Sequence, residues 1–252
     1  MWWLVPLFLA GFILVHLAKM LRLYLVLMEH KIGLGRFVLL YLKTTLVNLI
    51  IPFKLGELYR IFCISRETKH WQVGVLSILV DRFFDTLALC MILLPLDIFF
   101  FGGMSFITLL FLIVMAFVVI CYVSVLPTYK YLNRYLIKEK FSPRAMAALK
   151  GLDVVKSWYD FTQNLISGRF ALILLCSFGG WIFEVGTLKV LAKYLQVSFG
   201  AGDFTTYIQA IFGMGSSGLL RPYTIYSIVL MFAFTVAGFI AVFIKSRSRK
   251  KA

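Results

Sequence analysis

The sequence predicts an all-α integral membrane protein with about five transmembrane helices and two opposed re-entrant hairpins. Three observations predict this class. Hydrophobic residues make up 62% of the 252 positions and charged residues only 15%, whereas a soluble domain carries about a quarter charged residues. Several apolar stretches reach the length of about 20 residues that crosses a bilayer as a helix. The basic residues gather in a few segments between these stretches.

Five segments are predicted to span the membrane within one polytopic domain, residues 1–252. Residues 105–126 and 223–244 contain no charged residue. Residues 71–94 are interrupted by charges near their middle, and residues 170–192 carry charges toward their far end. The apolar part of the first span is just long enough to cross a bilayer, and the same helix is expected to continue into basic residues. The predicted spans are 2–22, 71–94, 105–126, 170–192 and 223–244.

The distribution of basic residues predicts the orientation of these spans, because cytoplasmic loops carry an excess of Lys and Arg. Segments 19–69 and 128–169 and the tail from Lys245 hold 22 of the 26 basic residues, while three lie on the opposite side. We therefore expect a multi-pass protein of the cell (inner) membrane whose N-terminus lies outside and whose C-terminus is cytoplasmic. The net charge of +15 is attributed to contact with anionic lipid headgroups rather than nucleic acid.

Two further apolar segments, residues 36–53 and 203–220, contain too many polar or irregular positions to span the membrane. We interpret both as re-entrant hairpins, the first entering from the cytoplasm and the second from outside, because irregular backbone at membrane depth needs protein or a water-filled cavity around it. Such an opposed pair points to a transporter binding site. Loops that lie flat at the interface are the alternative. Residues 127–169 are interpreted as a cytoplasmic amphipathic connector.

Charged residues inside the span 71–94 are the strongest indication of a functional site. Asp81 and Asp85 lie four residues apart on one helical face, with Arg82 between them. An ionised side chain at the bilayer centre costs about 2.5–3.5 kcal/mol, so these residues are expected to face a polar interior that contains partners. A salt-bridge lattice that only holds helices together is the alternative interpretation.

The expected partners lie just upstream of this span. Pro52 ends the first hairpin helix, because its ring excludes the preceding residue from helical geometry, and Gly56 permits a close turn. Glu57 then suits the first turn of a new helix, and Arg60 lies on the same face three residues on. The residues expected in one buried network are Lys54, Glu57, Arg60, Asp81, Arg82 and Asp85.

Counted alone, this network holds three basic and three acidic residues, and Arg22 is expected to make it positive. Arg22 follows the first apolar stretch and is expected to lie nearer the membrane interface than Arg82. Such a cavity favours an anion, and the forked donors of arginine match phosphate oxygens. The residues predicted to bind an anionic headgroup are Arg22, Lys54, Arg60 and Arg82.

These residues resemble the lysylphosphatidylglycerol synthase transmembrane family, which includes the flippase domain of the bacterial multiple peptide resistance factor. The resemblance rests on Arg22 at a helix end, on N-x3-P-x-[RK]-x-G-E-x2-R over residues 48–60, and on [ED]-R-x2-D over residues 81–85. It is specific over about residues 19–90 and weak but compatible over residues 170–244. The supporting residues that it implies for the network are Asn48, Pro52, Gly56, Glu57, Asp81 and Asp85.

The chain also departs from the family pattern. Lys54 and Asp81 stand where members usually have Arg and Glu. Members commonly begin with one more span, which we expect this chain to lack. Their second hairpin usually reads P-G-G-L-G followed shortly by Glu, whereas residues 213–222 here keep the glycine-rich turn only in part and hold no acid. The second-hairpin residues expected at the site are Gly215, Ser216, Ser217 and Gly218.

Residues and resemblance together predict a flippase-like transporter of an anionic phospholipid or a polyprenyl-phosphate-linked lipid. The alternative is a non-transporting membrane subunit that assists a glycosyltransferase in the synthesis of cell-envelope polysaccharide or glycolipid. An enzyme is not expected, because the sequence shows no catalytic constellation and no aminoacyl-transferase domain. The cysteines and histidines lack metal-site spacing, so we expect no metal and no cofactor. The exact lipid, the direction and energy source of transport, and the oligomeric state, a homo-oligomer included, stay open.

The basic asymmetry yields a test of orientation. Ser142→Cys and Ser248→Cys, each in a cysteine-free background, are expected to escape a membrane-impermeant thiol reagent that is applied to intact cells, because both lie in basic segments. Labelling after permeabilisation shows that each thiol is reactive. Rapid labelling of both positions in intact cells would reverse the predicted orientation.

Overall fold

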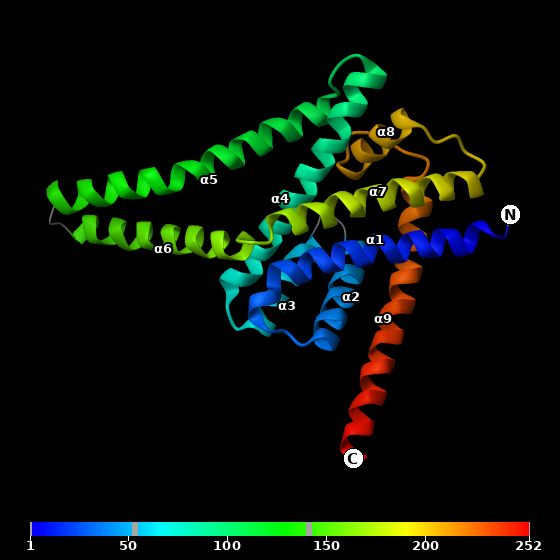
Figure 1. Cartoon of the computed structure of the whole chain (residues 1–252), viewed down its shortest axis with the longest axis horizontal. Helices are drawn as coiled ribbons and strands as arrows, with labels where there is room; N and C mark the ends of the chain where they lie inside the picture. Colours follow the sequence, from blue (N-terminus) through cyan, green and yellow to red (C-terminus); the bar gives the residue numbers. More distant parts are fainter. Residues whose placement is uncertain (1, 52–54, 140–142, 252) are drawn as a thin grey trace.

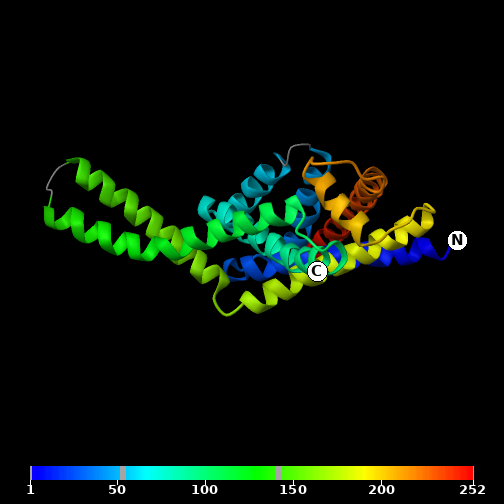
Figure 2. The same ribbon diagram turned by 90° about the horizontal axis from the view of Figure 1, so that it is seen from above.

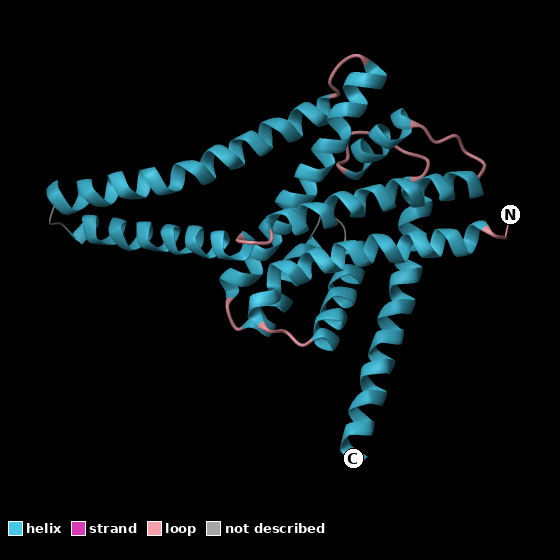
Figure 3. Ribbon diagram, viewed as in Figure 1, coloured by secondary structure: helices cyan, strands magenta, loops and turns pink. Residues whose placement is uncertain are grey.

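The computed structural model describes residues 2–51, 55–139 and 143–251. Within these ranges the chain forms nine α-helices, α1 to α9, and two short helical turns, η1 (Met28–His30) and η2 (Asp97–Phe101) (Figure 3). The prediction of an all-α membrane protein is confirmed. Three residues named from the sequence, Pro52, Lys54 and Ser142, lie outside the described residues.

Among the described residues, five helices are long and apolar enough to cross a membrane, and each coincides with one predicted span. They leave many large apolar side chains exposed, including Leu17, Ile113 and Phe232, as surfaces that face lipid do. The five are α1 (Leu4–Leu27), α4 (Trp71–Leu96), α5 (Phe106–Glu139), α7 (Phe170–Tyr194) and α9 (Leu220–Lys251).

Helices α1 and α7 lie side by side and run in opposite directions, and α4 passes beside them (Figure 1). Small residues permit this close approach. A Cβ at Gly11 would lie 2.5 Å from Thr187 Oγ1, and one at Gly180 would lie 3.8 Å from Ala18 Cβ. Small residues are a common means of packing helices in membranes, where lipid offers no hydrophobic driving force between them. The charged residues near the end of α1 are thereby held against α4 and α7.

The first predicted hairpin forms two helices, α2 (Leu34–Ile50) and α3 (Leu55–Thr68), which pack against each other below α1 in Figure 1. Their contact is close, because a Cβ on Gly56 would collide with the Cα of Asn48. Helix α2 also packs on α9, and α3 packs on α4. The hairpin thus positions its polar face toward α4. Its re-entrance into a membrane stays a prediction.

The predicted connector contains more helix than one amphipathic segment. Helix α5 continues beyond residue 126, where the predicted span ends, to Glu139, and α6 (Pro143–Ile166) returns along it. The rings of Tyr122 and Tyr159 stack with centroids 4.8 Å apart, and Tyr129 Oη donates to Asp153 Oδ1 at 3.0 Å. This pair of helices extends away from the others in both views (Figures 1 and 2).

The second predicted hairpin consists of α8 (Ala201–Ile211) and a turn that leads into α9. Gly213 in this turn has a φ of 74°, a left-handed conformation that glycine adopts without steric cost. Helix α9 then runs across α1 and α7 rather than along them (Figure 1), so the long helices do not form one parallel bundle. Re-entrance of this segment also stays a prediction.

Candidate functional site

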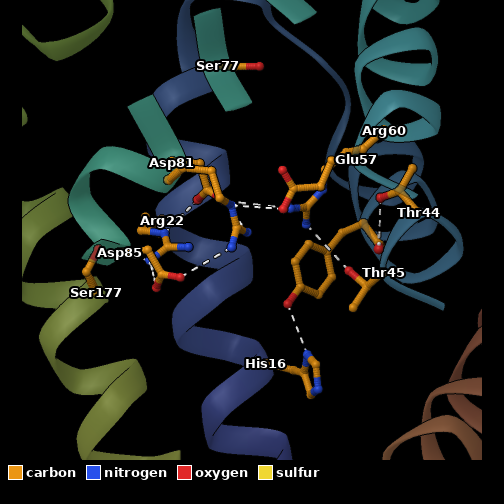
Figure 4. Close-up of polar contacts among 12 residues, drawn as sticks. His16, Arg22, Thr44, Thr45, Glu57, Arg60, Ser77, Asp81, Asp85 and Ser177 are labelled. Atoms are coloured by element: carbon orange, nitrogen blue, oxygen red, sulfur yellow. Dashed lines mark hydrogen bonds and ion pairs between the residues drawn. The ribbon is translucent and has the colours of Figure 1, made fainter. Parts of the chain in front are cut away.

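The centre of the buried charge cluster is Arg22 of α1, which faces α4 and α7 (Figure 4). Its Nε donates to Asp81 Oδ1 at 2.6 Å, and its Nη1 donates to Asp85 Oδ1 at 2.6 Å. Nη1 also lies 3.1 Å from Ser177 Oγ on α7. Two short, charge-assisted hydrogen bonds keep this guanidinium and both carboxylates satisfied in the interior.

Arg22 is buried in the protein more completely than Arg82, and its depth in the membrane stays a prediction. Its side chain is 2% exposed, whereas that of Arg82, expected deeper, is 41% exposed. The physical reason is rotation around the helix axis. Arg22 projects from the face of α1 that packs against α4 and α7, so its position close to the end of the apolar stretch does not bring it to the surface.

Arg82 of α4 contacts three carboxylates, of which only that of Glu57 belongs to α3. Its guanidinium nitrogens lie 3.1 Å from Asp81 Oδ2, 3.4 Å from Asp85 Oδ2 and 3.3 Å from Glu57 Oε1. The first hairpin therefore meets the charges of α4 through two contacts, Glu57 with Arg82 and Arg60 with Asp81. Because its side chain is partly exposed, solvent screens these ion pairs more than those of Arg22.

Arg60 of α3 is the least satisfied arginine of the cluster. Its Nη1 lies 3.7 Å from Asp81 Oδ2, and its Nη2 donates a long hydrogen bond of 3.5 Å to Thr45 Oγ1. Its Nε has no hydrogen-bond partner among the described residues, although the residue is buried. The guanidinium lies 5.6 Å from the centroid of the Tyr41 ring, so an aromatic face partly replaces the missing hydrogen bonds.

A polar cavity of about 150 Å³ opens beside Arg60. Asn48 contributes an amide oxygen, Oδ1, that also has no hydrogen-bond partner among the described residues. His16 Nδ1 lies 3.0 Å from Tyr41 Oη at one end. The lining residues are His16, Lys19, Arg22, Tyr41, Thr45, Asn48, Leu49, Arg60, Asp81, Arg82 and Asp85. Polar groups that lack partners thus meet in one enclosed volume.

A second ion pair, which the sequence analysis did not anticipate, adjoins this cavity. Lys19 Nζ lies 2.6 Å from Glu184 Oε2 on α7 and 5.7 Å from the centroid of the Trp181 ring. Each residue is visible in the sequence as a charge in an apolar helix, but they are 165 positions apart. Only the packing of α1 against α7 makes them partners.

The described charges of this cluster balance, while the predicted positive excess included Lys54, which lies outside the described residues. The basic residues Lys19, Arg22, Arg60 and Arg82 face the acidic residues Glu57, Asp81, Asp85 and Glu184. Positive charge is concentrated at Arg60, which is poorly paired. Both aspartates of α4 instead contact Arg22 and Arg82.

The second hairpin contributes less to this cavity than expected. None of residues 215–218 is among the described residues that line it, and Ser217 Oγ instead accepts from the Leu219 amide at 3.4 Å. Helix α8 reaches the cluster through Tyr207, whose Oη donates to Glu184 Oε1 at 3.3 Å. Among the described residues, no group of three or more His, Cys, Asp or Glu is arranged to hold a metal ion.

The fold and the site define a polytopic membrane protein with charged residues gathered between its apolar helices. The family model described as the lysylphosphatidylglycerol synthase TM region matches residues 1–239, and the chain belongs to this family. The family resemblance read from the sequence is therefore confirmed. No curated protein and no solved structure matches the chain.

The burial of the two arginines predicts unequal effects on stability. Arg22→Met leaves two buried carboxylates without their closest cation, and breaking a buried ion pair typically costs about 3–5 kcal/mol. Arg82→Met removes partly exposed pairs, so the loss is expected to be about 1 kcal/mol. Thermal unfolding of the purified protein in detergent measures both.

Arg134→Met is the matched control, because Arg134 is exposed on α5, and the change should be nearly neutral. Equal losses of stability for Arg22→Met and Arg82→Met would contradict the central position of Arg22.

Proposed function

We propose that this protein is a flippase-like transporter that moves an anionic phospholipid or a polyprenyl-phosphate-linked lipid across the cytoplasmic membrane. The observation that carries the proposal is the poorly paired guanidinium of Arg60, which borders an enclosed polar cavity. A cation that lacks a full set of partners in the interior favours a ligand that supplies them. Phosphate oxygens accept two parallel hydrogen bonds from one guanidinium.

The size of the cavity supports a headgroup phosphate as its occupant. A volume of about 150 Å³ is well above the roughly 10–15 Å³ that a cavity needs to hold one water molecule. This is room for a phosphate group with part of its hydration, whereas the hydrocarbon chains of a lipid must stay outside. Exposed apolar surfaces on the long helices offer the chains a lipid-like environment.

Charge neutralisation gives the site its physical role in the proposed transport. An uncompensated phosphate in the low-dielectric centre of a bilayer is strongly disfavoured. Arg60 and Lys19 both line the cavity, and together they offset the charge of one phosphate at that depth. The family's description names a synthase of lysylphosphatidylglycerol, a phospholipid, and this supports a phosphate-bearing lipid as the substrate class.

A second candidate function is a non-transporting membrane subunit that assists a glycosyltransferase. The pair of helices formed by the end of α5 and by α6 supports it, because this pair extends away from the remaining helices (Figure 2). Its exposed side chains include Lys130, Arg134 and Lys150 as well as Tyr131 and Met146. A surface of mixed basic and apolar character suits a protein partner. We take the basic segments to be cytoplasmic, with the N-terminus outside.

The proposed phosphate contact predicts that Arg60→Lys folds normally yet loses binding. A lysine keeps the charge but presents no planar fork, and the loss of a charge-assisted hydrogen bond of about 1.5–3 kcal/mol corresponds to about 10–100-fold in affinity. Binding is measured in detergent with two probes, a short-chain phosphatidylglycerol and a short-chain isoprenyl phosphate. The probe that binds more tightly identifies the lipid class.

Arg134→Lys is the matched control, because Arg134 is exposed on α5 far from the cavity. This variant should bind both probes with the affinity of the wild type. Glu57→Gln should weaken binding less than Arg60→Lys, since Glu57 contacts Arg82 and not Arg60. Full affinity in Arg60→Lys would show that charge alone suffices and that the two-pronged contact is wrong.

A further inference from the structure

The ion pair between Lys19 and Glu184 lies between the polar cavity and the second hairpin. Lys19 lines the cavity and its side chain is 29% exposed, whereas that of Glu184 is 6% exposed. Glu184 does not line the cavity. Its carboxylate faces Lys19 of α1, Tyr207 of α8 and Tyr223 of α9. The charge of Asp85 on α4 acts on Lys19. Lys19 is thus the sole cation that contacts Glu184 among the described residues.

Lys19 and Arg60 are the two cations of the cluster that each contact only one carboxylate. Arg22 contacts two carboxylates and Arg82 contacts three, but Lys19 contacts only one. Its ammonium group sits on a flexible four-carbon stem and makes no planar, two-pronged contact. A phosphate placed in the cavity therefore competes with a single carboxylate for Lys19.

Loss of Lys19 leaves Glu184 in an unfavourable state. Its remaining hydrogen bond comes from Tyr207 Oη at 3.3 Å, and an ionised carboxylate without a cation is costly in a low-dielectric interior. Such a group takes up a proton and becomes neutral. Asp81 and Asp85 keep their charge, because Arg22 stays bound to both.

We propose that binding of a phosphate-bearing headgroup is coupled to the uptake of one proton by Glu184. Lys19 Nζ moves from Glu184 to the phosphate and keeps all its protons, and the carboxylate of Glu184 gains one proton from water. The four basic and four acidic residues of the cluster balance before binding. The bound monoanion adds one negative charge and the proton adds one positive charge, so the occupied cluster is neutral again. This inference rests on the proposed anion site.

The coupling gives the proposed transport an energy source. When anion and proton enter together, the occupied site carries no net charge, which lowers the electrostatic cost of moving it through the membrane. A proton gradient then biases the direction of lipid movement. Residues 213–222 of the second hairpin hold no acid, and Glu184 of α7 supplies an acid that contacts α8.

Isothermal titration calorimetry of the full-length protein in detergent counts the protons. Each short-chain probe, phosphatidylglycerol or isoprenyl phosphate, is titrated in buffers that differ in ionisation enthalpy, and the slope of the observed enthalpy gives the protons taken up. For phosphatidylglycerol, which does not titrate near neutral pH, we expect about one proton per bound lipid. The wild-type affinity should fall by up to tenfold for each unit of pH increase.

Glu184→Gln separates this coupling from a structural role. Glutamine still accepts hydrogen bonds from Lys19 and Tyr207 but cannot take up a proton, and it leaves Lys19 free for the phosphate. The variant should therefore bind at least as tightly as the wild type, with about one proton fewer and little dependence on pH. An isoprenyl phosphate can itself take up a proton on binding. Subtracting the proton count of Glu184→Gln from that of the wild type removes this contribution.

The possible outcomes distinguish the proton coupling at Glu184 from the proposed function as a lipid transporter. Wild-type binding without proton uptake would overturn the coupling and leave the proposed function intact. Equal proton uptake by the wild type and Glu184→Gln would assign the proton to another group and also overturn it. If the wild type binds neither probe, the proposed function fails and this inference fails with it.

Discussion

The structure depends on the contact of one arginine with two aspartates. Arg22 reaches from α1 to Asp81 and Asp85 on α4 through two hydrogen bonds of 2.6 Å, and it also contacts Ser177 on α7. Neither aspartate can stay ionised in a low-dielectric interior without a cation at this distance. The contact thus fixes three long helices relative to one another and keeps negative charge available for Arg60 of the first hairpin.

The uneven pairing of the cluster separates support from binding. Arg22 donates to both aspartates and stays buried, and Arg82 connects α4 to α3 through Glu57. Arg60 is left with long contacts and an unused Nε beside the cavity. A network that is neutral as a whole can therefore present a positive end to a ligand. Lys19 also contacts one carboxylate, that of Glu184, which has no other described cation in contact.

Much of the fold and part of the site follow from the sequence by simple physics. Apolar length identifies the five long helices, and Pro52 with Gly56 locates the break between α2 and α3. The cost of burying Asp81 and Asp85 predicts that arginines meet them. The sequence does not show which way Arg22 faces, since that depends on the packing of α1 against α7. The pairing of Lys19 with Glu184 joins positions 165 residues apart, and no local spacing reveals it.

The most direct test of the account is lipid movement by the purified protein alone. Vesicles that contain the wild-type protein are loaded with a fluorescent phosphatidylglycerol or a fluorescent polyprenyl phosphate, and a membrane-impermeant quencher follows the exchange between leaflets. The account predicts faster exchange of at least one of these lipids than in vesicles that contain the Arg60→Lys variant. Exchange at the rate of protein-free vesicles for both lipids would contradict the account and favour the glycosyltransferase subunit.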